Sequence, residues 1–278
     1  MTQQLHQPAG SQPAQEQAGQ RTNVIIRVAK VSQRFAERVI FRDVSFEVAT
    51  GEVFVILGGS GCGKSTLMHQ MIGLLPPTTG SIEIAGTRIT GATTAAQRHA
   101  VQREFGVMFQ SGALFGSMTL LENVMLPLEM FTDLPPQGRA AVAQVKLGLV
   151  GLGQAAALMP AEISGGMTRR AGIARAMALD PPILFLDEPS AGLDPVTSAG
   201  LDRLILDLRH DLGTTFVVVT HELASIMAIA DRCIMLDAAA YPDAGGVIAE
   251  GDPQALASDS ANPRVRAFFH RTPVDAAA

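Results

Sequence analysis

The stretch GGSGCGKST, residues 58–66, decides the fold, because it fits the phosphate-loop pattern G-x-x-x-x-G-K-[S/T]. The β-branched apolar run at 53–57 precedes it and predicts a buried strand. Apolar residues follow it at helical spacing and predict a helix, namely Leu67, Met68, Met71, Leu74 and Leu75. Strand, glycine-rich loop and helix therefore come in the order that a nucleoside-triphosphate site requires.

The residue types of this loop explain why it would bind phosphate. Glycines let successive backbone N–H groups point at phosphate oxygens, and a helix that begins near Lys64 adds its positive end. We expect Lys64 to reach the β and γ phosphates and the Ser65 hydroxyl to coordinate Mg²⁺. A glycine-rich turn that binds nothing is the disfavoured alternative. The predicted binding residues are Gly58, Gly59, Ser60, Gly61, Cys62, Gly63, Lys64, Ser65 and Thr66.

Composition limits the class of protein. A chain of 278 residues is long enough for one large or two modest domains and needs no disulfide scaffold. Cys62 and Cys233 are the only cysteines, and we expect two small buried residues in a reducing compartment, with no metal cluster. A net charge of -5 with 17% charged residues argues against a protein that coats nucleic acid.

Hydropathy indicates that the chain does not cross a membrane by itself. No run reaches the roughly 18 consecutive apolar residues that a membrane-spanning helix requires. The N-terminus lacks a charged start followed by an apolar core, so we expect no secretory signal and a cytoplasmic protein. A content of 47% hydrophobic residues is nevertheless apolar for a free-standing enzyme, and docking against a membrane partner is one explanation.

The segments around the loop predict further structure on both sides of it. Residues 1–22 are rich in Gln, Pro, Ala and Gly, and we expect a disordered tail. The runs 24–31 and 44–48 predict an antiparallel sheet before the loop. Phe35, between these strands, is either an exposed ring that stacks on adenine or a core residue. Residues 111–161 show helical periodicity, which predicts a separate helical insertion.

Polar residues follow three further apolar runs. Gln110 could reach a metal or could be an ordinary strand end. Asp187 and Glu188 would be costly at the exit of a buried strand without a role; Asp187 fits a metal-holding acid, and Glu188 can polarise a water. A lone His221 would be structural, but it is the third strand exit in succession with a functional group. The predicted strands are 105–109, 182–186 and 215–220.

A second helix start resembles an anion site. Ser164, Gly165 and Gly166 precede a helix whose apolar residues repeat every three or four positions. The plain interpretation is a capped helix after a turn. One chain would then have two helix N-termini suited to binding phosphate. The sequence motifs described next explain why.

The order of the phosphate loop, Gln110, ISGGM at 163–167, ILFLDE at 183–188, SAGLDP at 190–195 and His221 closely resembles the ATP-binding-cassette ATPases. The likeness runs from about residue 24 to residue 251. It implies an α/β fold: a P-loop NTPase (RecA-like) core with an antiparallel β subdomain and an inserted α-helical subdomain. It also implies a head-to-tail homodimer with two ATP molecules between the phosphate loop of one chain and ISGGM of the other.

The resemblance assigns roles to matching positions. Ser65, Gln110 and Asp187 would hold Mg²⁺, Glu188 would be the catalytic base, and His221 would contact the γ phosphate. Gln110 would also contact the attacking water. The remaining assignments are Phe35 stacking on adenine, Ser164, Gly165 and Gly166 acting in trans, and Asp194 lining the dimer seam.

A departure from the pattern narrows the resemblance. Met167 stands where most of these ATPases have Gln, and ISGGMTRR with 109–115 and 262–266 resembles the ATPase of the Mla phospholipid transport system and related MCE-linked transporters. This implies a peripheral subunit at the cytoplasmic face of the inner membrane, bound to an MlaE-like permease. An MCE-domain protein, a small STAS-domain subunit as an optional addition, and no nucleic acid complete the expected partners.

Domain limits and contact surfaces follow from this resemblance. We expect the tail 1–22, the ATPase domain 23–251 with its helical subdomain at about 111–175, and a C-terminal helical tail at 252–278. Phe268 and Phe269 would pack back onto the domain or bind a partner. Apolar residues that form either a groove for a permease helix or the core of the insertion are Leu114, Phe115, Met118, Leu120, Val124 and Met130.

The expected function is an ATPase subunit that drives a permease to move phospholipid. One alternative keeps the ATPase and changes the cargo, for instance to amino acids. Soluble relatives that act on DNA or ribosomes are a second alternative, but they usually have a long coiled-coil insertion or two tandem cassettes. A regulatory switch without turnover is a third, and Glu188 argues against it.

Overall fold

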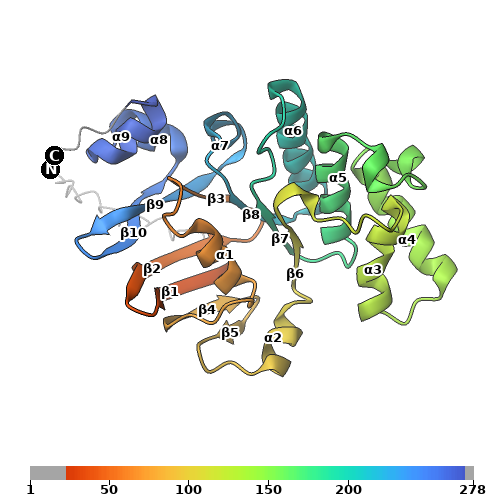
Figure 1. The fold of residues 1–278 in the computed structure, drawn as a ribbon, viewed down its shortest axis with the longest axis horizontal. Coiled ribbons are helices and arrows are strands. Elements are labelled where there is room, and N and C mark those ends of the chain that lie inside the picture. Colours follow the sequence, from red (N-terminus) through yellow and green to blue (C-terminus); the bar gives the residue numbers. More distant parts are fainter. Residues whose placement is uncertain (1–22, 273–278) are drawn as a thin grey trace, which may run out of the picture.

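The computed structural model describes residues 23–272, which are built around one ten-stranded sheet in the order β5-β4-β1-β2-β10-β9-β3-β8-β7-β6 (Figure 1). The expected tail 1–22 and the end of the expected C-terminal tail, 273–278, lie outside the described residues. The strands are β1 (Val24–Phe35), β2 (Arg38–Ala49), β3 (Val53–Gly58), β4 (Thr79–Ile84), β5 (Thr87–Ile89), β6 (Phe105–Met108), β7 (Ile183–Asp187), β8 (Thr215–Val219), β9 (Arg232–Tyr241) and β10 (Ala244–Gly251).

The parallel part of the sheet confirms the predicted buried strands. Strands β3, β8, β7 and β6 pair in parallel, and β3 also pairs with β9 in parallel. Alternate residues of β3 serve different cores: Val53, Val55 and Leu57 face one cluster, and Phe54 and Ile56 face the other. Both faces of these strands are therefore covered, which explains their continuous apolar sequences.

The antiparallel part of the sheet was also predicted. Strand β1 pairs with β2 and β4, and β4 pairs with β5, all antiparallel. Along β2, Val44, Phe46 and Val48 are buried and the residues between them are exposed, which is the alternation that the sequence shows. Phe46 stacks on Phe54 with ring centroids 5.1 Å apart, so the two parts of the sheet share a core.

Helices flank the sheet, and the helix after the phosphate loop ends earlier than expected. The helices are α1 (Lys64–Met71), α2 (Ala95–Val101), α3 (Leu120–Phe131), α4 (Pro136–Leu149), α5 (Gly165–Ala176), α6 (Pro195–Leu212), α7 (Leu223–Ile229), α8 (Pro253–Asp259) and α9 (Pro263–His270), with short 3-10 turns η1 (Gln110–Gly112), η2 (Gly153–Ala155) and η3 (Pro160–Glu162). Helix α5 ends at Ala176, so the apolar repeat that continues to residues 177 and 178 lies beyond it.

Gly73 explains why α1 is shorter than its apolar repeat. Its φ is 73°, and its N–H donates to Gln70 O while the N–H of Leu74 donates to His69 O. This pair of bonds is a Schellman motif, which ends a helix at a left-handed residue. The expectation that the helix includes Leu74 and Leu75 is wrong, and Leu74 is 58% exposed.

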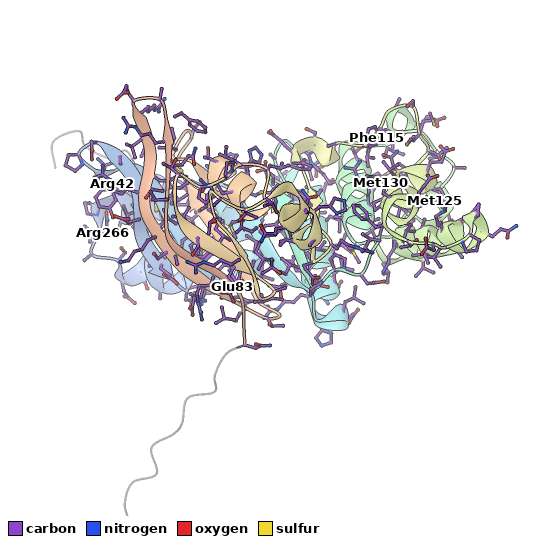
Figure 2. All side chains as sticks on the ribbon, turned by 90° about the horizontal axis from the view of Figure 1, so that it is seen from below. Arg42, Glu83, Phe115, Met125, Met130 and Arg266 are labelled. Carbon is purple, nitrogen blue, oxygen red and sulfur yellow. The ribbon has the colours of Figure 1, made fainter. Side chains whose placement is uncertain are left out.

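Three helices, α3, α4 and α5, gather at one end of the molecule (Figure 1). Leu120 and Val124 are fully buried there, so for these two the groove interpretation is wrong and they belong to the core. Phe115 and Met130 are 50% and 66% exposed, and both lie at this end of the molecule (Figure 2). The apolar surface after Gln110 is thus smaller than the sequence suggests.

The C-terminal helices pack on the main body. Asp252 and Asn262 cap α8 and α9 by accepting from the N–H groups of Gln254 and Arg264, as their positions before proline predict. Phe268 and Phe269 contact the larger core cluster and meet edge to face, with ring centroids 5.6 Å apart. The prediction that these rings pack back onto the chain is confirmed.

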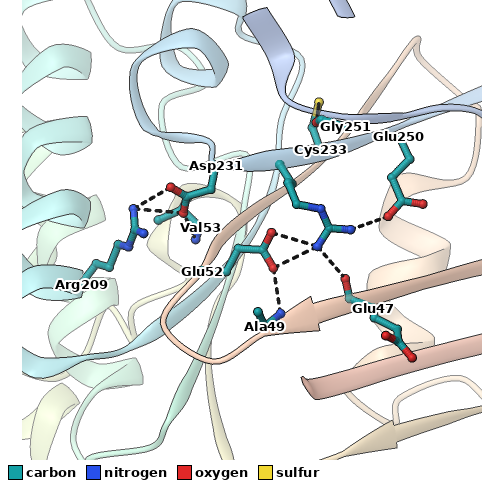
Figure 3. Close-up of polar contacts among 10 residues, drawn as sticks. Glu47, Ala49, Glu52, Val53, Arg209, Asp231, Cys233, Glu250 and Gly251 are labelled. Atoms are coloured by element: carbon teal, nitrogen blue, oxygen red, sulfur yellow. Dashed lines mark hydrogen bonds and ion pairs between the residues drawn. The ribbon is translucent and has the colours of Figure 1, made fainter. Parts of the chain in front are cut away.

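Ion pairs fasten the beginnings of β3 and β9 (Figure 3). Glu52, only 6% exposed, accepts from Arg232 at 3.1 Å and from the N–H of Ala49 at 2.7 Å. Asp231 accepts from Arg209 at 3.0 Å and from the N–H of Val53 at 2.8 Å. These contacts lie at the amino ends of the strands, away from the phosphate loop. None of the described helices is long and apolar enough to span a bilayer.

Candidate nucleotide site

The carboxyl ends of four adjacent parallel strands meet at one edge of the sheet. The phosphate loop follows β3, His221 follows β8, Asp187 ends β7, and Gln110 comes shortly after β6. Since neighbouring parallel strands end at the same edge, the fold brings these predicted residues together. Crevices at such an edge are where open α/β sheets bind ligands.

The phosphate loop is held tightly at its two ends. Gly58 has a φ of 146°, and a Cβ on it would lie 2.2 Å from Leu236 O. Gly63 has a φ of 101°, and a Cβ on it would lie 2.7 Å from the Phe41 ring. Between them, Gly59 and Gly61 have open space on the Cβ side. The loop is therefore a fixed backbone cradle with an accessible middle.

Side chains of the loop divide into inward and outward groups. The Lys64 ammonium is buried and donates to the carbonyl oxygens of Gly58 at 2.9 Å and Gly59 at 3.0 Å. Ser60 and Ser65 are exposed, while Cys62 is 2% exposed beneath the loop. The Cys62 side chain is thus a packing residue, and its backbone alone can face a phosphate. Helix α1 begins at Lys64, as predicted, and directs its N-terminus at the same place.

Two carboxylates at the end of β7 are incompletely satisfied. Asp187 is 8% exposed, and its Oδ1 atom and the Oε2 atom of Glu188 are buried without a hydrogen-bond partner. Burial raises the pKa of Asp187, and the charge of Glu188 raises it further, while His69 and Lys64 oppose the shift. A free carboxylate oxygen is costly unless it serves a ligand.

The donor set suits Mg²⁺. This ion binds through one or two carboxylates plus the phosphates of a substrate, and it prefers oxygen ligands. The free Asp187 oxygen, the exposed Ser65 hydroxyl and the exposed Gln110 amide supply such ligands. Among the described residues, no group of three or more His, Cys, Asp and Glu side chains offers a site that holds metal by protein ligands alone.

Glu188 and His221 form a pair. Nδ1 of His221 lies 2.9 Å from Oε1 of Glu188, and the Glu188 N–H donates to Val219 O on β8 at 2.8 Å. Glu188 has a φ of 47°, a strained value for a residue with a Cβ, which is typical of functional positions. His221 is half-exposed, so it can contact a ligand while it orients the carboxylate.

The Ser164 helix start lies apart from the phosphate loop of its own chain. Ser164 caps α5 by accepting from the N–H of Met167 at 3.3 Å, and Ser164 and Gly165 are exposed. Gly166 is buried, and a Cβ there would lie 2.4 Å from Cγ2 of Thr197. Strands β7 and β6 lie between α1 and α5 (Figure 1). The N-termini of these two helices therefore do not meet at one site within a single chain.

Two further predicted residues are exposed. Phe35 is the last residue of β1 rather than part of the connection after it, and it is 47% exposed, so the core interpretation is wrong. Asp194 is exposed and caps α6, accepting from the N–H groups of Val196 and Thr197 at 3.0 Å each. Its backbone role was not predicted from the sequence.

Residues that support the turn after Glu188 were missed. Arg169 is 8% exposed and donates to Ala191 O at 2.9 Å, and Asp202 is 7% exposed with a hydrogen bond from Ser225. The available signal was a charged residue inside an apolar helical stripe, as Asp202 is between Leu201 and Ile205.

Comparisons with known proteins agree with this geometry. The family model described as "ABC transporter" matches residues 41–191. The "probable ribonucleotide transport ATP-binding protein mkl" of Mycobacterium tuberculosis (strain ATCC 25618 / H37Rv) is 42% identical over 81% of this chain, which spans 62% of that protein's length. The "intermembrane phospholipid transport system ATP-binding protein MlaF" of Escherichia coli (strain K12) is 39% identical over 88% of both chains.

A solved structure supports the fold class. The dimeric post-hydrolysis structure of the ATP-binding cassette MJ0796 bound to ADP and Pi matches with a TM-score of 0.71 and 30% identity. The match covers 82% of this chain and 98% of that one, and it confirms the predicted P-loop fold. With its phosphate loop, its carboxylates at the end of β7 and its His221 at one sheet edge, this chain belongs to the ABC transporter family.

Proposed function

We propose that this chain is the ATP-hydrolysing subunit of an ABC transporter that moves phospholipids between membranes. The Glu188–His221 pair beside a phosphate loop is the observation that carries the enzymatic part. The relative named for intermembrane phospholipid transport supports the cargo, because the match extends over 88% of both chains.

Different residues at the sheet edge bind the phosphates, the adenine ring and Mg²⁺. The N–H groups of residues 58–66 and the Lys64 ammonium hold the phosphates, and Phe35 stacks on the adenine ring. Ser65, Asp187 and Gln110 hold Mg²⁺, which supplies neutralisation of phosphate charge when bound. The free Oδ1 atom of Asp187 supports this role, since it is buried and lacks a partner in the chain.

Glu188 is the general base in this proposal. Its Oε1 atom is occupied by His221, which leaves the buried and unpartnered Oε2 atom to accept a proton from the attacking water. Gln110 orients that water, and His221 contacts the γ phosphate. Water then attacks the γ phosphorus in line with the leaving oxygen, and the fixed N–H groups stabilise the developing charge.

A homodimer completes the site. Ser164, Gly165 and Gly166 of one copy face the ATP held by the phosphate loop of the other, and Asp194 lies at the seam. The position of α5 away from α1, and Val196 with 82% of its surface exposed beside Asp194, support this arrangement. Hydrolysis then depends on dimerisation, because each copy lacks one wall of its own site.

The remaining partners are membrane proteins. The exposed Phe115 and Met130 at the α3–α5 end provide a contact for an MlaE-like permease, with an MCE-domain protein and, optionally, a small STAS-domain subunit in the same assembly. The chain would act as a peripheral subunit at the cytoplasmic face of the inner membrane. In domain terms, 23–251 is the ATPase domain with a helical subdomain at about 111–175, followed by the tail 252–278.

Replacing Glu188 with Gln tests the enzymatic proposal. Glu188→Gln keeps the shape and a hydrogen-bond acceptor for His221 but cannot take a proton, so we expect the ATPase rate to fall by about 100-fold or more. The variant should still bind ATP and accumulate as a dimer in size-exclusion chromatography with Mg-ATP. Glu129→Gln, exposed on α3, is the matched control and should hydrolyse ATP normally. Undiminished hydrolysis by Glu188→Gln would remove this residue as the base.

Cargo requires a separate experiment. Ribonucleotides, named for the mycobacterial relative, and amino acids are the competing cargoes. We expect the chain to co-purify with a membrane permease, and the complex in vesicles to move a fluorescent phospholipid only with ATP. Transport of labelled nucleotide or amino acid, with the lipid left in place, would replace the cargo and leave the ATPase assignment intact.

A further inference from the structure

Behind the turn that follows Glu188, serine hydroxyls surround a buried carboxylate. The Ser225 Oγ atom lies 2.9 Å from Oδ2 of Asp202, 3.3 Å from Oγ of Ser190 and 3.4 Å from Oγ of Ser198. Asp202, Ser190 and Ser225 are 7%, 3% and 2% exposed. A hydrogen-bonded cluster this well shielded from water fixes the positions of the segments that contribute to it.

The donors and acceptors of this cluster set the direction of its hydrogen bonds. A serine hydroxyl has one proton, and an ionised carboxylate can only accept. With Asp202 ionised, the proton of Ser225 therefore goes to Asp202, and the oxygen of Ser225 is left to accept from Ser198. A neutral Asp202 could instead donate to Ser225, whose own proton would then go to Ser190, the acceptor in that pair.

Each member of the cluster belongs to a segment that carries a residue of the nucleotide site. Ser190 is two residues after Glu188, Ser225 is four residues after His221, and Asp202 is on α6, the helix that Asp194 caps. Arg169 holds the same turn from α5 through Ala191 O. Asp202 is thus linked through Ser225 to the Glu188 turn and to the segment after His221, and it has no hydrogen bond to the Glu188 or His221 side chain.

A buried carboxylate at this place costs free energy. Its charge lacks an ion-pair partner among the described cations, and burial raises its pKa while the hydrogen bond from Ser225 opposes the shift. A cavity of about 490 Å³ adjoins it, and the charged groups that line this cavity are Arg203 on α6, Glu222 before α7, and Arg271 after α9. An apolar residue would fill the position at lower cost, so packing alone does not explain the carboxylate.

We propose that Asp202 is a positioning residue for ATP hydrolysis. It acts through Ser225 and Ser190 to hold the Glu188 and His221 side chains in their relative positions. This inference rests on the proposed ATPase function. It predicts that loss of the cluster lowers kcat and leaves nucleotide binding nearly unchanged, because no hydrogen bond joins the phosphate loop after β3 to the cluster.

Kinetics of a small variant set test this proposal with the full chain and Mg-ATP. Asp202→Ala and Ser225→Ala should each lower kcat by about fivefold or more while KM changes by less than about twofold. The double variant should be no slower than the slower single variant, since both changes break one cluster. Asp202→Asn keeps an acceptor for Ser225 and should fall between the wild type and Asp202→Ala. Asp207→Ala, on an exposed part of the same helix, is the control and should match the wild type.

Specific results would overturn the proposal. Wild-type kcat in Ser225→Ala and Asp202→Asn, the mildest changes, would show that the cluster is structural only. Losses that multiply in the double variant, or a rise in KM at constant kcat, would also refute it. A wild-type chain that forms its dimer but does not hydrolyse ATP would refute the proposed function itself, which is a different outcome.

Discussion

Asp187 and Asp202 are buried and Glu188 is partly buried, and the three carboxylates have different environments. The first two keep one oxygen each without a partner at the sheet edge, and Asp202 is hydrogen-bonded to Ser225. In the proposed function, the free oxygens beside the phosphate loop serve a ligand, whereas the hydrogen-bonded Asp202 serves the geometry of its neighbours. The environment of each carboxylate therefore separates binding and catalysis from positioning.

The raised pKa of Asp202 has a consequence for stability. Because burial raises the pKa in the folded chain, the ionised carboxylate costs stability at neutral pH, and this cost disappears as pH falls through the folded-state pKa towards the unfolded one. Asp202→Asn lacks this cost. We expect the stability of the variant relative to the wild type to decrease on going from pH 7 to acidic pH, as measured by urea unfolding. A difference that does not depend on pH would contradict the shift.

Both thiols should be unreactive in the native protein. Burial raises the pKa of Cys62, and it raises the pKa of Cys233 to about 12, so neither forms the reactive thiolate at pH 8. We expect slow modification by a disulfide reagent at pH 8 and rapid modification of two thiols after unfolding in guanidinium chloride. Cys62→Ser and Cys233→Ser identify which thiol reacts; fast labelling of native Cys233 would contradict its burial.

The sequence predicts which residues meet at the sheet edge better than it predicts their contacts. The phosphate loop, Gln110, Asp187, Glu188 and His221 follow predicted strands, and adjacency of those strands suffices to bring them to one edge. The partners of Asp202 could not be inferred, because Ser190 and Ser225 come from other segments and polar residues there look like ordinary turn residues. Hydrogen bonds between distant segments require the tertiary structure.

Among the elements, helix α3 has a clear start signal. Thr119 accepts from the N–H of Glu122 at 3.2 Å, and the Glu122 carboxylate accepts from the N–H of Thr119 at 2.7 Å. These reciprocal bonds form a capping box, which satisfies two N–H groups at the helix start. Pro127 lies inside the same helix and has no N–H group, so α3 lacks one internal hydrogen bond. The capping box therefore matters more for the stability of this helix.

Removing this cap should destabilise the chain by a small and measurable amount. Thr119→Ala should lower the free energy of unfolding by about 1 kcal/mol, because the N–H of Glu122 loses its acceptor. Urea unfolding followed by circular dichroism measures the change. Thr119→Ser keeps the oxygen and is the control. Equal stability of Thr119→Ala and the wild type would show that the cap contributes nothing.

Element boundaries depend on signals of different strength. The starts of α8 and α9 can be recognised in the sequence, since aspartate or asparagine before proline is a local signal. The end of α1 at Gly73 was missed because the apolar repeat continues past it. The burial of Leu120 and Val124 was left open, because an apolar helical face looks the same whether it packs inside the chain or against a partner.

At the scale of the whole molecule, a parallel part and an antiparallel part form one ten-stranded sheet. Parallel strands carry the site at their carboxyl ends, and the ion pairs of Glu52 and Asp231 fasten their amino ends. The sequence predicted both parts of the sheet but not their joining, because a single pairing, Gly245 of β10 with Phe41 of β2, connects strands far apart in the chain.

Binding of nucleotide should stabilise this whole structure. At an excess of about 100-fold over Kd, a ligand that binds the folded state alone adds about 2.7 kcal/mol. For a chain of this size we expect Mg-ATP to raise the Tm of Glu188→Gln by about 5 °C or more in a thermal melt.

Lys64→Ala provides the comparison for this melt. Without the ammonium that Gly58 and Gly59 now hold, ATP affinity should be lost, and Mg-ATP should leave the Tm unchanged. Lys30→Ala on β1 keeps the loop intact and should melt like the parent chain. An unchanged ATP affinity in Lys64→Ala would contradict the assignment of the loop.

The glycines of the phosphate loop differ in how they would tolerate change. A methyl group at Gly58 or Gly63 collides with Leu236 O or the Phe41 ring, so every variant there disturbs the fold before any ligand arrives. A methyl group at Gly59 meets empty space. In a saturation library selected first for expression and then for growth, we expect variants at position 59 to be expressed but not to support growth. That position therefore offers a clean means of asking how closely the triphosphate approaches the main chain.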